Sequence, residues 1–215
     1  MKIGISNLKG GVGKTTVSQN LAVGLAHVGY KVCIVDTDRN QNSVSWVGER
    51  SGELPSILAV GVTDTKALNK MADQLEADHD FIIIDGTPSL SEMTTRIILS
   101  SDLLIIPILP SGHDIRSMQI FFERYEQAKE FRENIPAYFF INQYSETIKL
   151  HQSTKELLND FGIGIMETKF NRRVAYAETS ITGQGVYEYS DEKAKAEVTA
   201  LTKEVLEIAK KLGYL

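Results

Sequence analysis

The sequence has one cysteine, no long apolar run and no histidine pair at the spacing of metal ligands. A single cysteine cannot form a disulfide within the chain, and Cys33, inside the apolar run VCIV, is expected to be a small buried hydrophobe. The four histidines are scattered, so no structural metal site is expected. The longest apolar runs, 81–84 and 103–109, are too short to cross a bilayer, and the first residues do not resemble a signal peptide. These absences favour a cytoplasmic protein without a membrane partner.

Basic charge is also scarce, since 23 Lys and Arg residues stand against 28 Asp and Glu, a formal net charge of −5. This excludes a surface that is basic throughout, so any contact with nucleic acid must come from a local patch or from an assembled state. With 215 residues, 42% of them hydrophobic, the chain is long enough to bury a full core. No repeat, low-complexity tract or long linker divides it, and a single domain over 1–215 is expected.

Short β-branched runs alternate with longer helical patterns. The nearly continuous apolar runs are 2–6, 31–36, 81–85, 103–108 and 137–142, and weaker ones lie at 56–60 and 163–167. Strands buried on both faces have this composition, which predicts an α/β, doubly wound, mostly parallel sheet with helices on both faces. The run at 56–60 is expected at an edge of the sheet.

Two helices are predicted in more detail. The first should begin inside a glycine-rich loop and end near His27, with Gly29 following it. The second, at 192–212, has apolar residues at alternating spacings of three and four. Its apolar face is aliphatic and its charges are mixed in sign, which favours docking on the sheet over binding to a membrane surface.

The segment LKGGVGKTT, residues 8–16, holds three glycines and two lysines. Its second half matches the end of the phosphate-binding pattern G-x-x-x-x-G-K-[ST], although that pattern has glycine where this chain has Leu8. A predicted strand precedes it and a predicted helix follows, which is the context that a phosphate loop requires. We therefore expect the phosphates of a nucleotide to be surrounded by the backbone N–H groups of Gly10, Gly11, Val12, Gly13 and Lys14.

Three side chains of this loop have distinct predicted roles. Lys14 is expected to bridge the outer phosphates, Thr15 to give its hydroxyl to Mg²⁺, and Thr16 to reach the inner phosphate. The dinucleotide-binding pattern G-x-G-x-x-G is excluded, because the position of its third glycine after Gly11 and Gly13 is Thr16. The sequence therefore predicts a site for a nucleoside triphosphate.

Acidic residues stand at the ends of two other predicted strands. Asp85 ends the run FIIID, while Asp36 and Asp38 belong to VDTD. Open α/β sheets bind ligands at the carboxyl ends of their strands, so these acids are expected near the phosphate loop. Asp85 is predicted to hold Mg²⁺ through its water shell, and Asp36 or Asp38 to orient the attacking water. A helix N-cap is the alternative for any one of them, and the convergence of three strand ends on one loop favours the metal and water roles.

The order KGGVGKTT, VDTDRNQ, FIIIDGTPS and IIPILPS, with GVYEYSDEKAKAE near the end, resembles the ParA/MinD family of deviant Walker A ATPases over essentially the whole chain. Within that family the chain is most similar to the small, ParF-type plasmid-partition proteins. Only Met1 precedes the first predicted strand, so no N-terminal helix-turn-helix domain is expected. The resemblance implies hydrolysis of ATP to ADP and phosphate with Mg²⁺.

The resemblance also assigns roles to individual residues. Lys9 matches the family's signature lysine, which reaches the partner's phosphates in an ATP-dependent homodimer and is thus a cation supplied in trans. Asp38 matches the residue that positions the hydrolytic water, and Asp36 is expected to support the magnesium site. The family usually reads D-x-D-P-Q, and residues 39–41 of this chain, RNQ, depart from it.

Further along the chain, the resemblance implies a base pocket. Pro107 and Pro110 are implied to shape this pocket and the dimer face, although a proline-broken strand end is an equally good explanation of both. Asn142, followed by Gln143, lies where an amide that reads the base would be.

The segment KFNRRVAYAE clusters Lys169, Arg172 and Arg173 near a predicted helix start. The matching segment of partition ATPases contributes to non-specific DNA binding, and a solvated basic face is the alternative. One such patch on an acidic chain should bind DNA weakly, whereas a dimer doubles the patch. DNA binding that depends on ATP is therefore expected.

The sequence thus predicts a DNA-segregation ATPase whose hydrolysis is stimulated by a centromere-binding, ParB-like partner. A MinD-like, membrane-cycling regulator is one alternative, and it requires an amphipathic segment beyond the helix that ends near Leu215. A relative of the nitrogenase iron protein needs cysteines for a cluster, which Cys33 alone cannot supply. A third alternative, a ParA-like positioner of protein cargo, uses the same chemistry and stays open.

Overall fold

The computed structural model describes residues 1–88, 92–148, 151 and 153–215. Within these residues one parallel sheet has the strand order β3-β2-β4-β1-β5-β6-β7. The strands are β1 (Lys2–Ile5), β2 (Val32–Asp36), β3 (Leu58–Gly61), β4 (Phe81–Asp85), β5 (Leu103–Ile108), β6 (Ala137–Tyr144) and β7 (Gly164–Asn171). The predicted parallel α/β fold is confirmed, with the weak runs forming the two edge strands, β3 and β7.

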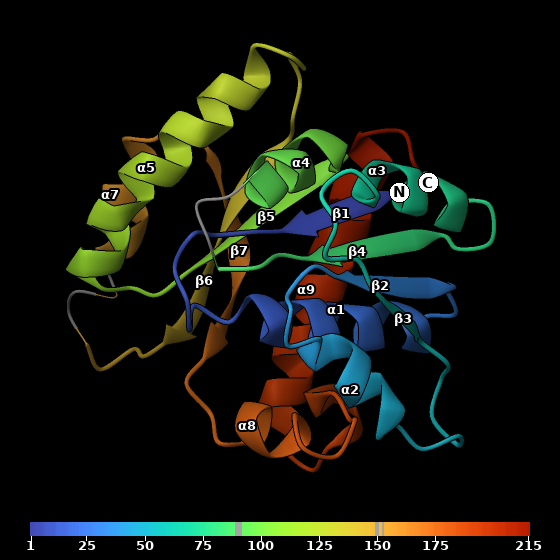
Figure 1. Ribbon diagram of the computed structural model, residues 1–215. Coiled ribbons are helices and arrows are strands. Elements are labelled where there is room, and N and C mark those ends of the chain that lie inside the picture. Colours follow the sequence, from blue (N-terminus) through green and yellow to red (C-terminus); the bar gives the residue numbers. More distant parts are fainter. Residues whose placement is uncertain (89–91, 149–150, 152) are drawn as a thin grey trace.

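Helices cover both faces of this sheet (Figure 1). One face carries α1 (Lys14–His27), α2 (Asn42–Gly48), α8 (Ala175–Thr179), the short 3₁₀ turn η1 (Val186–Glu188) and α9 (Glu192–Lys211). The other carries α3 (Leu68–Leu75), α4 (Glu92–Ser100), α5 (Gly112–Lys129) and α7 (Thr154–Asn159). The chain is therefore doubly wound, as predicted.

The central strands are buried on both faces. In β5, Leu103 and Ile105 pack on the α1 and α9 side, whereas Leu104 and Ile106 pack on the α5 side, because successive side chains of a strand alternate. Such a strand has no solvated face, which explains its continuous apolar composition. Cys33 of β2 is also fully buried, and burial raises the pKa of its thiol to about 12, so it is the small apolar side chain that was predicted.

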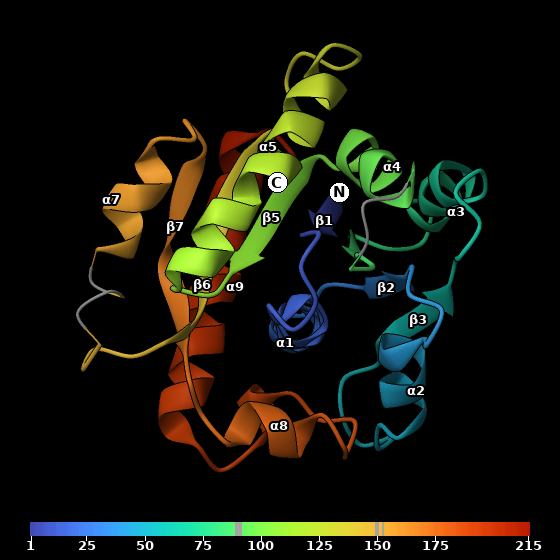
Figure 2. The same ribbon diagram turned by 60° about the vertical axis from the view of Figure 1, so that its left-hand side comes forward.

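The two helices predicted in detail are confirmed. α1 begins at Lys14 and is followed by Gly29, whose φ of +101° is the left-handed conformation that ends many helices. Asp191 caps α9 by accepting hydrogen bonds from the N–H groups of Lys193 and Ala194. Figure 2, which looks nearly along α1, shows this helix at the centre of the molecule, beside the sheet. In the part of the chain that is described, no helix is both long and apolar enough to cross a membrane.

The topology brings the predicted site residues to one edge. β4 lies between β1 and β2, and the register pairs Ile5 of β1 and Asp36 of β2 with Asp85 of β4. Because all three strands are parallel, the acids at their carboxyl ends lie beside the loop that leaves β1.

Candidate nucleotide site

The phosphate loop connects β1 to α1 through two glycines with positive φ. Gly11 has a φ of +76° and Gly13 a φ of +92°, a region in which glycine has little strain. At Gly13 a Cβ atom would also collide with the side-chain amide of Asn142, which donates a hydrogen bond to the carbonyl of Val12 at 2.8 Å. Gly13 is thus required both by its backbone conformation and by the close approach of Asn142.

Lys14 lies within this loop. Its side chain is almost fully buried, and its Nζ donates a hydrogen bond to the carbonyl of Lys9 at 2.9 Å. Burial lowers the pKa of Lys14 to about 8, while the charges of Asp85 and Asp38 favour the ammonium form. Lys14 is therefore mainly a cation at pH 7, as is required of a group that binds phosphate.

Lys9 has a different partner. Its Nζ lies 2.7 Å from Oδ1 of Asp114, in the first turn of α5. The Lys9 side chain is 39% exposed and that of Asp114 only 4%. Ser111 caps α5 and contacts the same carboxylate. The two lysines of the loop are thus separated, one buried in the loop and one paired with a neighbouring helix.

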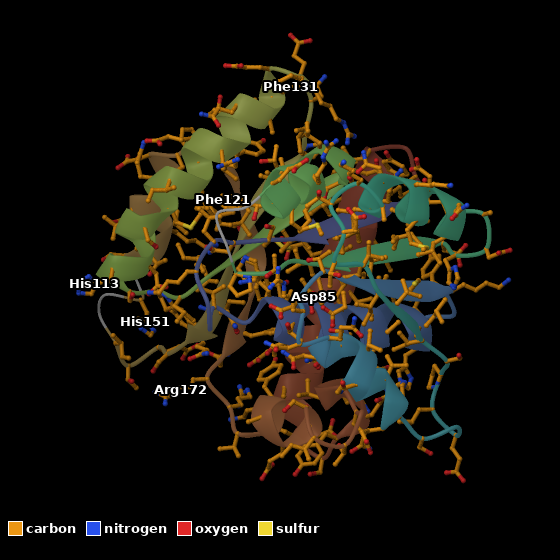
Figure 3. All side chains as sticks on the ribbon, viewed as in Figure 1. Asp85, His113, Phe121, Phe131, His151 and Arg172 are labelled. Atoms are coloured by element: carbon orange, nitrogen blue, oxygen red, sulfur yellow. The ribbon has the colours of Figure 1, made fainter. Side chains whose placement is uncertain are left out.

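Asp85 is surrounded by hydroxyl groups at the end of β4. It is 2% exposed and accepts hydrogen bonds from Ser18 Oγ at 3.0 Å, from Ser43 Oγ at 2.8 Å and from the Thr15 hydroxyl. Burial and the neighbouring Asp36 raise its pKa to about 6, so it is ionised at pH 7. Figure 3 shows Asp85 in the interior of the molecule, and it is the last residue of β4. A carboxylate beside the Thr15 hydroxyl is the kind of oxygen donor set that fits Mg²⁺.

The two acids after β2 differ in their surroundings. Asp36 is fully buried and accepts hydrogen bonds from the N–H groups of Asp38, at 3.0 Å, and Ser43, at 2.7 Å. Burial raises the pKa of Asp36. Asp38 is half-buried and accepts from the Asn40 N–H at 2.9 Å and from Thr87 Oγ1 at 3.4 Å. In this arrangement Asp36 orders the loop that carries Asp38, and Asp38 has oxygen lone pairs left for a water molecule.

Sequence reasoning missed several supporting hydroxyls. Thr37 Oγ1 donates to the carbonyl of Asp85 at 2.8 Å and accepts from the N–H of Thr87 at 3.1 Å, which connects the ends of β2 and β4. Ser18 and Ser43 likewise attach α1 and α2 to the Asp85 carboxylate. The sequence indicated these residues only by their position inside or next to the motifs. Their hydrogen-bond partners could not be predicted because those partners lie far along the chain.

The two prolines lie at different places. Pro107 is buried within β5, and its carbonyl accepts a hydrogen bond from Asn7 Nδ2 at 2.7 Å, which supports the base of the phosphate loop. β5 pairs with β1 only as far as Ile105, so the missing N–H of Pro107 breaks no bond on that side. Pro110 lines a small cavity of about 210 Å³ together with Arg172.

Asn142 has both ends of its amide engaged within the chain. Its Nδ2 donates to the Val12 carbonyl, as described above, and its Oδ1 accepts from the N–H of Gln143 at 2.9 Å. The side chain is 4% exposed. The contacts therefore make Asn142 a support of the phosphate loop, a role that was not predicted for it.

A polar cavity of about 360 Å³ adjoins the loop at Thr16. Its other walls include Asn142 of β6, Asn171 of β7 and Tyr176 of α8. Thr16, predicted to face the inner phosphate, lines this cavity and a second one beside α2, and we propose that the nucleoside lies in the cavity that Asn142 also lines. Its volume is typical of small-molecule sites. Sequence reasoning had assigned no part of the site to Asn171 or Tyr176.

The three basic residues predicted to bind DNA are not equivalent. Arg173 forms an ion pair with Glu197, with 2.8 Å between Nη2 and Oε1, and Lys169 Nζ lies 3.5 Å from the ring centroid of Tyr144. Arg172 is exposed, and Figure 3 shows it at the periphery of the molecule. The structure therefore leaves Arg172 more accessible than the other two cations.

Comparison with known proteins identifies the family of this chain. A family model described as AAA domain matches residues 1–72 and 52–136. Maintenance of carboxysome distribution protein A of Halothiobacillus neapolitanus is 27% identical over 207 residues, which cover 95% of each chain. Protein ParA of Rhizobium radiobacter is 29% identical over 180 residues, which cover 80% of this chain and 79% of the relative.

The fold is shared with a solved structure. The septum site-determining protein MinD of Pyrococcus horikoshii, complexed with Mg-ADP, superposes with a TM-score of 0.76 at 20% identity, covering 100% of this chain and 99% of the other. The family match covers more than half of the chain. The chain therefore belongs to the ParA/MinD family of deviant Walker A ATPases, P-loop enzymes that use ATP and Mg²⁺.

Proposed function

We propose that this protein segregates DNA by an ATP-driven cycle. ATP binding drives the formation of a homodimer, the dimer binds DNA without sequence preference, and a centromere-binding, ParB-like partner stimulates hydrolysis and release. The protein is then cytoplasmic and associates with the nucleoid in its ATP form. The observation that carries this proposal is the separation of the two loop lysines, with Lys14 buried in the loop and Lys9 on Asp114.

Lys9 supports the dimer because its charge is available to a second chain. Lys14 already provides a cation inside the loop, and Lys9 is held only by a half-exposed ion pair with Asp114. Breaking such a pair costs about 1 kcal/mol or less. In a two-fold dimer each Lys9 can then meet the phosphates bound by its partner, a cation supplied in trans. Without ATP there is no anion to draw Lys9 away from Asp114.

Within each protomer the remaining residues divide the chemistry. Lys14 would hold the outer phosphates, and Thr15 and Asp85 would hold Mg²⁺, which supplies charge stabilisation for phosphoryl transfer. Asp38 would orient the attacking water. The hydrogen bond that Asp38 accepts from Thr87 is long, at 3.4 Å, so the carboxylate has capacity left to accept one from water.

DNA binding is proposed for the groove beside the end of β7. Arg172, Arg173 and Lys193 line this groove of about 570 Å³, and Lys169 lies nearby on β7. Arg172 and Lys193 are exposed. Because the chain carries a net charge of −5, one groove should bind DNA weakly, and two grooves in a dimer should bind it with avidity.

A protein cargo is the second candidate for what is moved. The relative from Halothiobacillus, named for carboxysome distribution, aligns with nearly the whole of this chain. A relative from Thermus thermophilus, named as a probable plasmid-partitioning protein, supports the DNA cargo. The ATP and DNA chemistry proposed here serves both, so the partner protein would determine which cargo is positioned.

The proposal is tested by co-sedimentation with random-sequence DNA and, separately, with anionic liposomes, each with ATP, ADP or no nucleotide. We expect sedimentation with DNA alone, and only in ATP. Lys9→Ala should bind ATP but not sediment with DNA. Binding to liposomes without binding to DNA would contradict the proposal and favour a membrane-cycling regulator.

The DNA groove has its own variant. Arg172→Ala combined with Lys193→Ala should weaken binding to every DNA sequence alike and lower its salt dependence. Lys66→Ala with Lys70→Ala is the matched control, since it removes the same charge from exposed positions near α3. An unchanged salt slope in the first pair would locate DNA binding elsewhere.

A further inference from the structure

One carboxylate of α9 holds a wall of the cavity beside Thr16. Glu197 Oε1 accepts hydrogen bonds from Asn171 Nδ2 at 2.7 Å and Arg173 Nε at 2.9 Å. Its Oε2 accepts from the Asn171 N–H at 3.2 Å and the Tyr176 hydroxyl at 2.8 Å. Asn171, Arg173 and Tyr176 all line the cavity, whereas Glu197 reaches them from the helix behind. Three parts of the wall therefore depend on one acceptor.

The surroundings of Glu197 make this arrangement rigid. Its side chain is 11% exposed, and the ion pair with Arg173 balances its charge. The Tyr176 ring stacks on Phe170, with 4.8 Å between centroids and an interplanar angle of 25°. Burial and the Glu197 charge raise the pKa of Tyr176 far above its usual value, so its hydroxyl remains a donor to the carboxylate. The hydrogen bonds to Glu197 and the stacked ring thus fix the geometry of this wall.

Glu197 also determines which end of the Asn171 amide is free. An ionised carboxylate only accepts hydrogen bonds, so the group of Asn171 that meets it must be the NH₂. The amide oxygen, an acceptor, is then the end of the amide that does not meet Glu197, in a residue that lines the cavity. At position 6 adenine has an amino donor where guanine has a carbonyl acceptor, so an acceptor that faces position 6 discriminates between the two bases.

We infer that Glu197 is a positioning residue for the nucleoside, and that it gives the site its preference for ATP over GTP by orienting Asn171. This inference rests on the proposed placement of the nucleoside in the cavity beside Thr16. It adds to the phosphate loop a second determinant, located on the last helix, for which nucleotide enters the cycle.

The test is Glu197→Gln, which keeps the shape but removes the charge. A glutamine has one acceptor oxygen and one NH₂ donor, so it cannot accept from all of the donors that Glu197 serves. Dissociation constants for ATP and GTP are measured by competition with a fluorescent ATP analogue, and KM and kcat by phosphate release. We expect the ATP/GTP affinity ratio to fall about tenfold, the effect of one lost hydrogen bond to the base. KM for ATP should rise while kcat at saturation changes little, because Lys14 and Asp38 are untouched.

Glu204→Gln is the matched control. Glu204 is on the same helix and accepts hydrogen bonds from the N–H groups of Glu167, at 2.7 Å, and Thr168, at 2.9 Å, so it also attaches α9 to β7. Its contacts lie outside the residues that line the cavity. It should lower the melting temperature in the same way as Glu197→Gln but leave the ATP/GTP ratio unchanged.

Asn171→Ala removes the proposed acceptor together with one donor to Glu197, keeps the Glu197 charge, and covers the case in which Glu197→Gln does not fold. A lower ATP/GTP affinity ratio in Asn171→Ala than in the wild-type protein supports the inference. An unchanged ratio in Asn171→Ala, or equal binding of ATP and GTP by the wild-type protein, overturns it and leaves the proposed ATPase cycle intact. A wild-type protein that bound neither nucleotide would overturn the nucleotide site itself.

Discussion

The ion pair between Lys9 and Asp114 predicts that Asp114→Asn tightens ATP-dependent dimerisation. Asparagine keeps the shape of the side chain in the first turn of α5 but removes its charge. In the wild-type chain, Lys9 must leave Asp114 before it can reach the phosphates of a partner. In the variant no carboxylate holds it, so the dimer forms without this step.

The magnitude follows from the geometry of the pair. The ions are 2.7 Å apart, with Lys9 39% and Asp114 4% exposed, so the pair is intermediate between a surface contact and a buried one. Exposed pairs contribute up to about 1 kcal/mol, and we take that upper value because Asp114 is nearly buried. Two pairs are broken for each dimer, which gives about 2 kcal/mol, or about 30-fold in the dimer dissociation constant.

Sedimentation velocity in ATP measures this constant, with Asp38→Ala in every chain to block turnover. Adding Asp114→Asn should lower the dissociation constant, whereas adding Lys9→Ala should give monomers that Asp114→Asn does not rescue. Glu167→Gln, which breaks the surface pair with Lys155, also at 2.7 Å, is the control and should change nothing. An unchanged or weaker dimer with Asp114→Asn, or a normal dimer with Lys9→Ala, would refute the reasoning.

Three other substitutions have definite expected outcomes. Asp38→Ala should slow phosphate release by about 10²-fold or more while ATP binding persists, because this is the effect of losing a group that assists proton transfer. Turnover at the wild-type rate in this variant would show that Asp38 does not have that role. Gly13→Ala should abolish ATP binding and lower the melting temperature, because the φ of residue 13 is +92° and the new Cβ meets Asn142. Titration calorimetry measures the ATP binding, and scanning calorimetry measures the melting temperature. Glu188→Gln should destabilise the fold by about 3 kcal/mol at pH 7 in urea unfolding, because it leaves the buried Arg50 without its partner at 2.5 Å. Burial opposes ionisation of Glu188, but hydrogen bonds from Arg50 and the Gly185 N–H lower its pKa. The stabilisation by Glu188 is therefore complete above about pH 4.3, the ordinary pKa of glutamate, and is lost as the pH falls through the lower pKa of the folded state. A difference between the two proteins that did not depend on pH would contradict this account.

The strands and the phosphate loop were predictable because their signals are local. A strand buried on both faces needs an unbroken apolar run, as in 81–85, and a phosphate loop needs glycine where φ is positive, as at Gly13. The strand order could not be predicted in this way. The strand order depends on which strands pair along their edges, and the same succession of strands and helices in the sequence is compatible with more than one order. The supporting hydroxyls of Ser18 and Ser43 were missed because serines are common and their partner, Asp85, lies elsewhere in the chain.

The cavity beside Thr16 shows the same limit. Asn142, predicted to read the base, lines the cavity and also donates to the Val12 carbonyl and accepts from the Gln143 N–H. Asn171 had no motif to distinguish it, yet it lines the cavity because Glu197 holds it there. Neither role follows from residue type or spacing, since each depends on a partner from a distant element.

The sequence alone thus determined the parallel α/β fold, the phosphate loop with its two lysines, and the acids at the strand ends, because each of these follows from residue pattern within a short segment. Only the tertiary structure decided which charged groups are engaged. It pairs Lys9 with Asp114, places Arg173 on Glu197 and leaves Arg172 exposed. The physical reason is that a side chain's availability for ligand, partner or DNA depends on its nearest neighbours in space, and folding brings those neighbours from segments remote in the sequence.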